Sequence, residues 1–287
     1  MAARRIAGAW APVLGGVLAW ALLGATPLPV QAQLKPSATY VAMGSSFAAG
    51  PGLLPYETGS PMRCARSTRN YAHLLAARRE LVLKDVSCSG ATTAAVLAPW
   101  RDEPAQIDAV GSATRWVTVT VGGNDVGYIG GLIEASCQQL LAQGRQPAPR
   151  CHSLGGAGDD AAFEALERSL RDIAVAVRQR APQATLVWVD YPVVLPVEGG
   201  CEQAPLSPDQ AREAHRLAAR LEAVTARVAQ DSGSLLLRAS SLSLGHDVCS
   251  VMPWMWGYPA PAGGAPYHPN AQGMAAVADA LDRLLRR

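Results

Sequence analysis

Short apolar runs rich in β-branched residues alternate with amphipathic stretches along most of the 287-residue chain. The predicted strands span 39–43, 81–86, 116–121, 185–189 and 234–237. Runs that are apolar throughout are typical of parallel strands buried on both faces. Helical periodicity is found between them, over 70–80, 160–180, 208–229 and from about 269 onward. This order predicts an α/β fold, a three-layer α/β/α sandwich with a mainly five-stranded parallel sheet.

Four longer tracts show neither periodicity, and they span 51–67, 138–159, 192–205 and 247–266. We expect these tracts to form loops near the carboxyl ends of the strands. Proteins with this architecture place their binding and catalytic sites at that edge of the sheet.

The N-terminus is typical of an export signal. Arg4 and Arg5 precede an apolar run that ends near Leu23, and small residues then predict cleavage before Gln33. An uncleaved membrane anchor is the alternative, because the run approaches the ~20 residues that span a bilayer. Prolines and glycines interrupt the run, which favours cleavage. The predicted parts are a signal peptide over 1–32 and a single domain over 33–287 of a secreted bacterial protein, extracellular or in the cell envelope.

Charge excludes one class of partner. The formal net charge is +2, and both excess charges are Arg4 and Arg5, so the remainder of the chain is formally neutral. No basic stripe of the kind that nucleic-acid binding needs is present in the sequence. We therefore expect no nucleic-acid partner, no stable membrane anchor after signal removal, and a monomer.

Six cysteines follow the predicted signal, which favours disulfides formed in an oxidising compartment. They are, in order along the sequence, Cys64 and Cys88, Cys137 and Cys151, Cys201 and Cys249. The sequence alone leaves many connectivities open. Pairing of sequence neighbours is favoured, because each pair brackets one loop-containing stretch. A metal site is the alternative, but the sequence contains neither C-x-x-C nor H-E-x-x-H, so we expect no metal.

Four positions that could carry chemistry adjoin separate predicted elements: Ser46, Gly90, Asn124 and His268. Each has an ordinary explanation alone, since Ser caps helices, Gly and Asn form turns, and a loop His is commonly a surface residue. Together they supply what acyl transfer requires, namely a nucleophile, a backbone donor, an amide donor and an imidazole base. Of the five histidines, only His268 lies at a helix start, where the helix dipole favours the neutral form that a base needs.

The order and spacing of these positions resemble the SGNH hydrolases, also called GDSL-type lipases and esterases. The matching segments are YVAMGSSFAAGPG over 40–52, Gly90, VGGND over 121–125 and HPNAQG over 268–273. The resemblance implies a flavodoxin-like fold, with Ser46 as nucleophile and His268 as base. It also implies an oxyanion hole formed by the backbone N–H groups of Ser46 and Gly90 and by the side-chain amide of Asn124. It implies no cofactor. The secreted actinomycete-type branch also implies three bridges, Cys64–Cys88, Cys137–Cys151 and Cys201–Cys249.

Two positions depart from the family pattern. Ser45 stands where the first family segment has Asp, which leaves two adjacent hydroxyls, although the register favours Ser46. Ala265 stands where many members have an Asp that orients the histidine. Some secreted members are Ser–His dyads that use a main-chain carbonyl at this spacing. The resemblance therefore implies a dyad in which the Ala265 carbonyl orients His268. Asp247 is the alternative partner.

The resemblance implies a secreted carboxylic ester hydrolase that acts on acyl esters of lipids or small alcohols. A carbohydrate O-deacetylase or a phospholipase would share this chemistry. A non-catalytic binding protein that has kept the fold is the alternative from another class. The apolar segment VMPWMW over 251–256 favours lipid-like substrates if it lines an acyl site, but packing on the core explains it equally well.

Overall fold

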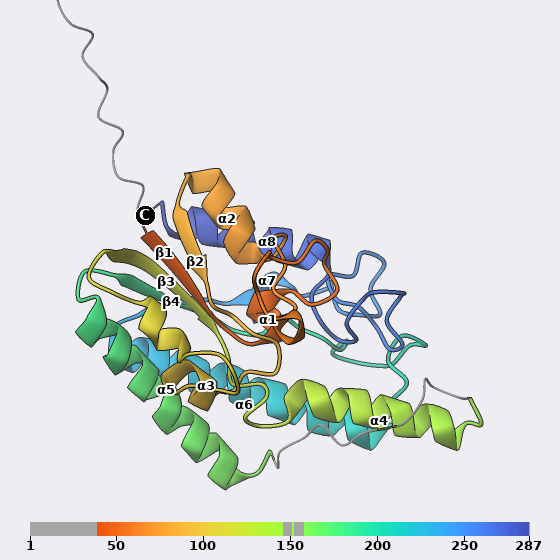
Figure 1. The fold of residues 1–287 in the computed structure, drawn as a ribbon. Helices are drawn as coiled ribbons and strands as arrows, with labels where there is room; N and C mark the ends of the chain where they lie inside the picture. The colour runs from red at the N-terminus through yellow and green to blue at the C-terminus, as the bar shows by residue number, and fades with distance from the viewer. Residues whose placement is uncertain (1–38, 146–150, 152–157, 287) are drawn as a thin grey trace, which may run out of the picture. The chain divides into compact units, whose positions relative to one another are not determined.

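The computed structural model describes residues 39–145, 151 and 158–286, so the predicted signal peptide lies outside the described residues. Five parallel strands form one sheet in the order β2-β1-β3-β4-β5 (Figure 1). The strands are β1 (Thr39–Gly44), β2 (Val82–Asp85), β3 (Thr114–Thr120), β4 (Thr185–Val189) and β5 (Leu235–Leu237). The chain runs outward from β1 to β2 and then returns to β3 on the other side of β1. The carboxyl ends of β1 and β3 therefore flank a topological switch point, where ligands bind in such sheets.

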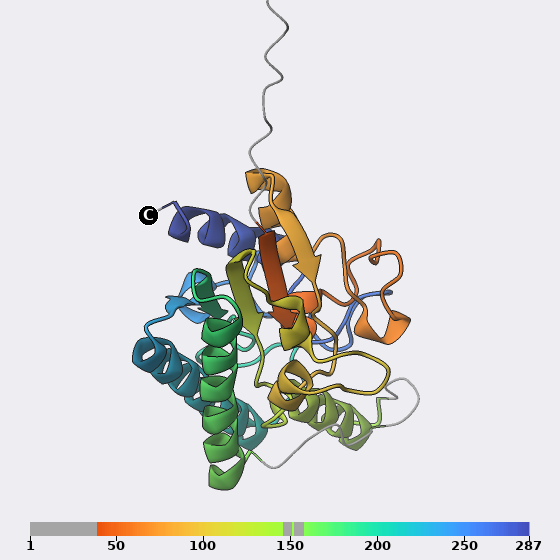
Figure 2. The ribbon, with the colours of Figure 1, turned by 60° about the vertical axis from the view of Figure 1, so that its left-hand side comes forward.

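Helices cover both faces of the sheet (Figures 1 and 2). One face carries α2 (Tyr71–Arg79) and α8 (Ala271–Leu284), and the short α7 (Ala239–Leu242) lies beside them. The opposite face carries α3 (Thr93–Leu97), α4 (Tyr128–Ala142), α5 (Asp160–Arg180) and α6 (Pro208–Ser232). The predicted three-layer α/β/α architecture is confirmed.

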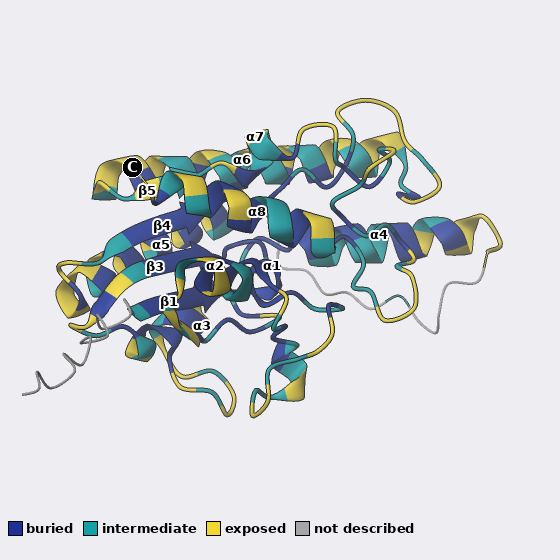
Figure 3. Ribbon diagram, turned by 90° about the horizontal axis from the view of Figure 1, so that it is seen from above, coloured by how far each residue is buried: buried dark blue, intermediate teal, exposed yellow. Residues whose placement is uncertain are grey.

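Alternation along β1 explains why the sheet has two cores. Tyr40 and Ala42 pack toward α2 and α8, while Val41 and Met43 pack toward the helices of the other face. All four side chains are buried, so this central strand is apolar throughout. Figure 3 shows that β1 and β4 are largely buried, while the outer faces of the surrounding helices are exposed.

The helix α4 was not predicted, and the tract expected to be irregular over 138–159 begins inside it. Its buried residues recur at helical spacing, as Leu132, Ser136 and Leu140. However, adjacent glycines interrupt its first turns, and its N-terminus follows Gly127 in a left-handed conformation with no side-chain cap. By contrast, α6 begins at the predicted capping box formed by Ser207 and Gln210.

Three disulfides join cysteines that are neighbours in the sequence: Cys64–Cys88, Cys137–Cys151 and Cys201–Cys249. The first links the loop after α1 (Ser46–Ala49) to the turn after β2, and the last links the loop after β4 to the loop after α7. These two bridges therefore restrain loops near the carboxyl edge of the sheet. Within the part of the chain that is described, no helix has the length and apolar character to cross a bilayer.

Candidate active site

Ser46 and His268 meet at the carboxyl edge of the sheet. The Ser46 Oγ lies 2.7 Å from the His268 Nε2, although 222 residues separate the two positions. Ser46 is the first residue of α1, directly past β1, and His268 lies just before α8. Each residue is only 8% exposed, so the pair lies at the protein surface but is largely shielded from water.

The environment of His268 fixes its protonation state. Its Nδ1 donates a hydrogen bond to the Pro266 carbonyl at 2.7 Å, which leaves the Nε2 lone pair facing the Ser46 hydroxyl. Burial lowers the pKa of His268 to about 4, and the bond to Pro266 opposes this shift only in part. The imidazole is therefore neutral near pH 7 and is the tautomer that can accept a proton from Ser46.

The prediction that the Ala265 carbonyl orients His268 is wrong by one residue. The Ala265 carbonyl accepts the backbone N–H of His268 at 3.2 Å, which closes a β-turn. Pro266 is the second residue of this turn, and Tyr267 is the third, with φ of 59°. This is the type II pattern, in which the carbonyl of the second residue is free to bond outside the turn. The Asp247 carboxylate, the other predicted partner, accepts the Cys249 N–H instead.

The side chain of Tyr267 holds this unusual turn. A positive φ is uncommon for a residue with a Cβ, so surrounding contacts must maintain it. The Tyr267 ring is fully buried, and its hydroxyl lies 2.5 Å from the Ser136 hydroxyl on α4. Helix α4 therefore fixes the residue that precedes His268.

Ser45 is directed away from the histidine. Its Oγ lies 3.2 Å from the Tyr191 hydroxyl and 3.4 Å from the Thr120 carbonyl oxygen, and the side chain is buried. Of the two adjacent serines, Ser46 is thus the one whose hydroxyl faces His268. The Ser45 hydroxyl instead ties the turn after β1 to β3 and to the segment after β4.

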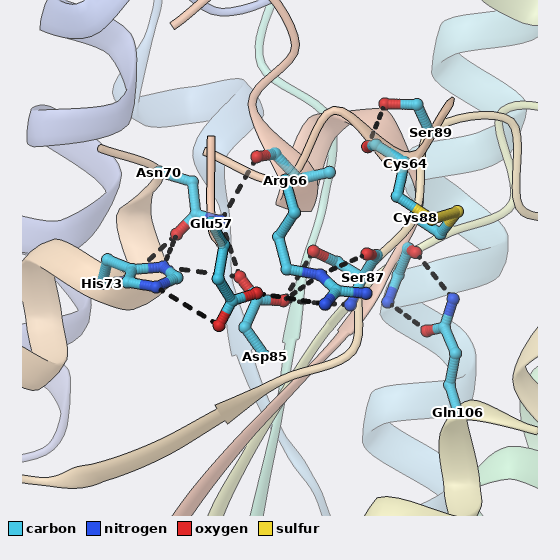
Figure 4. Close-up of polar contacts among 12 residues, drawn as sticks. Glu57, Cys64, Arg66, Asn70, His73, Asp85, Ser87, Cys88, Ser89 and Gln106 are labelled. Carbon is cyan, nitrogen blue, oxygen red and sulfur yellow. Dashed lines mark hydrogen bonds and ion pairs between the residues drawn. A yellow bond between two sulfur atoms is a disulfide. The ribbon is translucent and has the colours of Figure 1, made fainter. Parts of the chain in front are cut away.

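Gln106, which the sequence did not reveal, holds the residue before this turn with both ends of its side-chain amide. Its Oε1 accepts the Gly44 N–H at 2.7 Å, and its Nε2 donates to the Gly44 carbonyl at 3.0 Å (Figure 4). Gly44 has φ of 138°, and a Cβ there would overlap the Thr120 carbonyl oxygen, so only glycine fits. The Gly44 carbonyl also accepts the Cys88 N–H at 3.0 Å, which ties the turn after β2 to the turn after β1.

Asn124 and Gly90 lie on two turns that contact each other. The Asn124 Nδ2 donates to the Ala91 carbonyl at 2.8 Å, and the Asp125 carboxylate accepts the Thr93 N–H at 3.1 Å. One hydrogen of the Asn124 amide remains for another acceptor. Within the described residues, the backbone N–H groups of Ser46 and Gly90 have no protein acceptor. All three predicted oxyanion donors therefore have a hydrogen available.

A model of the GDSL-like lipase/acylhydrolase family matches residues 42–276, a span that includes Ser46, Gly90, Asn124 and His268. The chain belongs to this family. It is a carboxylic ester hydrolase of the lipase/esterase type.

Relatives of known name resemble the chain over nearly all of its length. A protein named Lipase 2 from Streptomyces coelicolor is 33% identical over 271 residues, which are 92% of this chain and 91% of the relative. A lipase from Streptomyces rimosus is 31% identical over 277 residues, 94% of each chain. The crystal structure of phospholipase A1 from Streptomyces albidoflavus superposes with a TM-score of 0.70 at 26% identity, and covers 86% of this chain and 99% of that one.

The loop after α7 braces His268 and Asn270 through backbone hydrogen bonds. The Trp256 N–H donates to the His268 carbonyl at 2.9 Å, and the Asn270 N–H donates to the Trp254 carbonyl at 2.8 Å. Met255 between the two tryptophans is buried, whereas Val251 and Met252 are exposed. The apolar segment over 251–256 therefore divides into a buried bracing part and an exposed end.

A buried polar network supports the turn that carries Gly90 (Figure 4). The Asp85 carboxylate accepts hydrogen bonds from the Asn70 side chain at 2.7 Å and the Ser87 hydroxyl at 2.6 Å. Arg66 donates to the Ser87 carbonyl at 2.9 Å and lies 3.8 Å from Asp85. Burial raises the pKa of Asp85, and the hydrogen bonds and Arg66 counteract that shift. Across the described residues, no group of three or more His, Cys, Asp or Glu is placed to hold a metal ion.

Proposed function

We propose that Ser46 and His268 form a catalytic dyad that hydrolyses acyl esters through an acyl-enzyme. The observation that carries this proposal is the 2.7 Å contact between the Ser46 Oγ and the Nε2 of a neutral His268. A nucleophilic hydroxyl needs a base within hydrogen-bond reach, and that base must be unprotonated at the working pH. The Pro266 carbonyl takes the place of the acid of a triad, because it selects the required tautomer.

The reaction has two half-steps. In the first, the Ser46 Oγ bonds to the ester carbonyl carbon while its proton passes to the His268 Nε2. The resulting oxyanion is stabilised by the N–H groups of Ser46 and Gly90 and by the Asn124 amide. The carbon–oxygen bond to the alcohol then breaks, and His268 returns the proton to the leaving oxygen. In the second half-step, water attacks the acyl-enzyme with His268 as base, which releases the acid and restores Ser46.

Lipid esters are the proposed substrate class. The relatives named above are lipases and a phospholipase A1. A second candidate, the acyl ester of a phospholipid, is favoured by the likeness to the phospholipase, which extends over 86% of this chain. We also propose that residues 1–32 are a signal peptide and that a single domain over 33–287 is secreted. The three disulfides favour an oxidising compartment, and one structural relative is an extracellular lipase from Streptomyces rimosus.

A fluorophosphonate probe tests the nucleophile directly. We expect the probe to label Ser46, which peptide mass spectrometry would identify, and Ser46→Ala to lose about 10⁴–10⁶ in kcat on p-nitrophenyl esters. Ser45→Ala is the matched control, and it should retain labelling. Loss of labelling in Ser45→Ala with retained activity in Ser46→Ala would overturn the proposal. An unlabelled wild-type protein would identify a non-catalytic member of the family.

A chain-length series of acyl esters, measured beside phospholipids and acetylated sugars, tests the substrate class. We expect kcat/KM to be higher for long acyl chains than for acetyl esters of sugars. A preference for acetylated sugars would make the enzyme a carbohydrate deacetylase acting through the same dyad.

A further inference from the structure

The segment from α7 to the first half of α8 is nearly free of charge. Residues 239–278 contain a single Asp, Glu, Lys or Arg, which is Asp247, although such residues make up 17% of the chain. Asp247 is buried, and its carboxylate accepts the Cys249 N–H at 2.8 Å. The surface formed by this segment therefore presents almost no formal charge to solvent.

Three large apolar side chains are exposed on the same segment. Leu244 is 61% exposed, Val251 is 100% exposed and Met252 is 69% exposed. We refer to these three residues as the apolar tip. Two hydrogen bonds bring the parts of the tip together: the His246 Nδ1 donates to the Met252 carbonyl at 2.8 Å, and the Trp254 N–H donates to the His246 carbonyl at 2.8 Å. A soluble domain rarely leaves neighbouring large apolar residues this exposed without a partner.

The apolar tip is held rigidly. The Asp247 carbonyl accepts two hydrogen bonds from Ser250, from its backbone N–H at 3.1 Å and from its hydroxyl at 2.9 Å. These bonds fix the turn before Val251. The disulfide Cys201–Cys249 links this turn to the loop after β4. The His246 and Trp254 rings stack in parallel with centroids 3.9 Å apart. Because the loop is already ordered, contact with an apolar phase would cost little further conformational entropy.

The same loop leads directly into the active site. Two residues beyond the His246–Trp254 stack, the Trp256 N–H bonds to the His268 carbonyl at 2.9 Å. The segment therefore connects the apolar tip to His268 over a few residues. The tip and His268 both lie at the carboxyl edge of the sheet. A surface that meets the tip lies on the side of the molecule that carries Ser46.

We propose that the apolar tip inserts into the surface of zwitterionic lipid aggregates and docks the enzyme on its substrate, an inference that rests on the proposed lipid-ester function. The charge pattern selects this type of surface. No Lys or Arg between 239 and 278 would attract anionic headgroups. The adjoining loop after β4 carries two acidic residues, the exposed Glu198 and Glu202. The Glu202 carboxylate pairs with Arg145 at 3.1 Å. Docking is thus driven by apolar burial and is insensitive to salt.

Sedimentation with phosphatidylcholine vesicles tests the docking. The protein is recovered from the culture medium of an exporting host and carries Ser46→Ala, so that no lipid is hydrolysed during the measurement. We expect Val251→Ser and Met252→Ser each to lower the vesicle partition coefficient about tenfold. Val175→Ser is the matched control, since Val175 on α5 is 53% exposed but lies away from this loop. This control should partition as the parent does.

A second measurement separates docking from chemistry. With Ser46 present, Val251→Ser should hydrolyse soluble p-nitrophenyl acetate at the parental rate and lose about tenfold on vesicle-borne esters. Equal partitioning of parent and tip variants would overturn the proposal. Partitioning that is abolished by 0.5 M salt, which shortens the range of charge interactions, would also overturn it. A dimer in analytical ultracentrifugation that Val251→Ser dissociates would assign the tip to self-association and also overturn it. Retained esterase activity in Ser46→Ala would instead refute the dyad and leave the docking result intact.

Discussion

The two halves of the proposed dyad are held in place by different parts of the polypeptide. Around the nucleophile, side chains hold the backbone: Gln106 binds both polar groups of Gly44, and Tyr191 binds the Gly123 N–H at 2.9 Å. Around the base, backbone groups hold the side chain and its segment, through the Pro266 carbonyl and the bonds to Trp254 and Trp256.

This difference determines which substitutions each half should tolerate. A hydrogen bond from a side chain is lost when that side chain is replaced, and buried partners are then left unpaired. A main-chain carbonyl remains whatever residue carries it, provided that the backbone keeps its conformation. The nucleophile half should therefore respond strongly to single substitutions, and the base half should respond weakly unless its turn is altered.

Outside Ser46 and His268 themselves, the largest effect is expected at Asn124. Asn124→Ala removes one oxyanion donor and should lower kcat by about 10²–10³ with a smaller change in KM, because the donor acts mainly in the transition state. Thr93→Ala is the control, since it loosens the contact between the same two turns at Asp125 without removing an amide donor. Comparable losses in both variants would show that Asn124 only shapes the turn.

Gln106→Ala should have the next largest effect. The variant leaves the N–H and carbonyl of Gly44 without the Gln106 amide, which holds the backbone that leads to Ser46. Because Ser46 would then be misplaced, kcat and the fluorophosphonate labelling rate should both fall by about 10–10². Tyr40→Phe is the control, because it removes a buried 2.7 Å hydrogen bond between Tyr40 on β1 and Thr118 on β3, away from the dyad. Both variants should lose about 1–3 kcal/mol in the free energy of unfolding. Equal loss of labelling in both would reduce Gln106 to a structural role.

The pH dependence reports on the base half. Because burial lowers the pKa of His268 to about 4, the base is protonated and inactive only below that pH. The kcat/KM on a soluble, uncharged ester should rise as pH increases through about 4 and be level from about 6 upward. A histidine paired with a carboxylate would keep its proton to higher pH, which would move the acid limb upward. An acid limb centred near 7 would contradict the dyad described here.

The smallest effect is expected at position 265. Many family members carry Asp there, but Nδ1 of His268 already donates to Pro266 at 2.7 Å. Ala265→Asp should therefore change kcat/KM by less than about threefold, which is the size of effect expected from the small interaction energy of a solvent-exposed charge. Steady-state kinetics near pH 7 would measure it. A tenfold gain would mean that the main-chain carbonyl is a poor substitute for an acid.

The fold and much of the site were predictable because their signals are local in the sequence. The strands are continuous apolar runs, α6 has a capping box, and Ser46, Gly90, Asn124 and His268 each adjoin an element whose end could be placed. In contrast, the clamp by Gln106 reaches Gly44 over 62 residues, and a lone glutamine in an irregular stretch gives no signal of its own.

The error at Ala265 has a similar cause. Choosing between the carbonyls of Ala265 and Pro266 requires the turn type, and the turn type depends on the positive φ of Tyr267. A non-glycine residue rarely adopts that conformation, so the sequence favours no such turn. The conformation is imposed by a tertiary contact with Ser136 on α4, a long helix whose start the sequence did not mark.

That contact makes esterase activity depend on the docking of α4. The left-handed backbone at Tyr267 persists only while burial of the ring and the bond to Ser136 maintain it. Until α4 has packed against the segment before α8, the Pro266 carbonyl has no fixed direction and the imidazole has no selected tautomer. A chain with its sheet formed but α4 undocked would thus carry Ser46 without an oriented His268, and it would not hydrolyse esters until α4 docked.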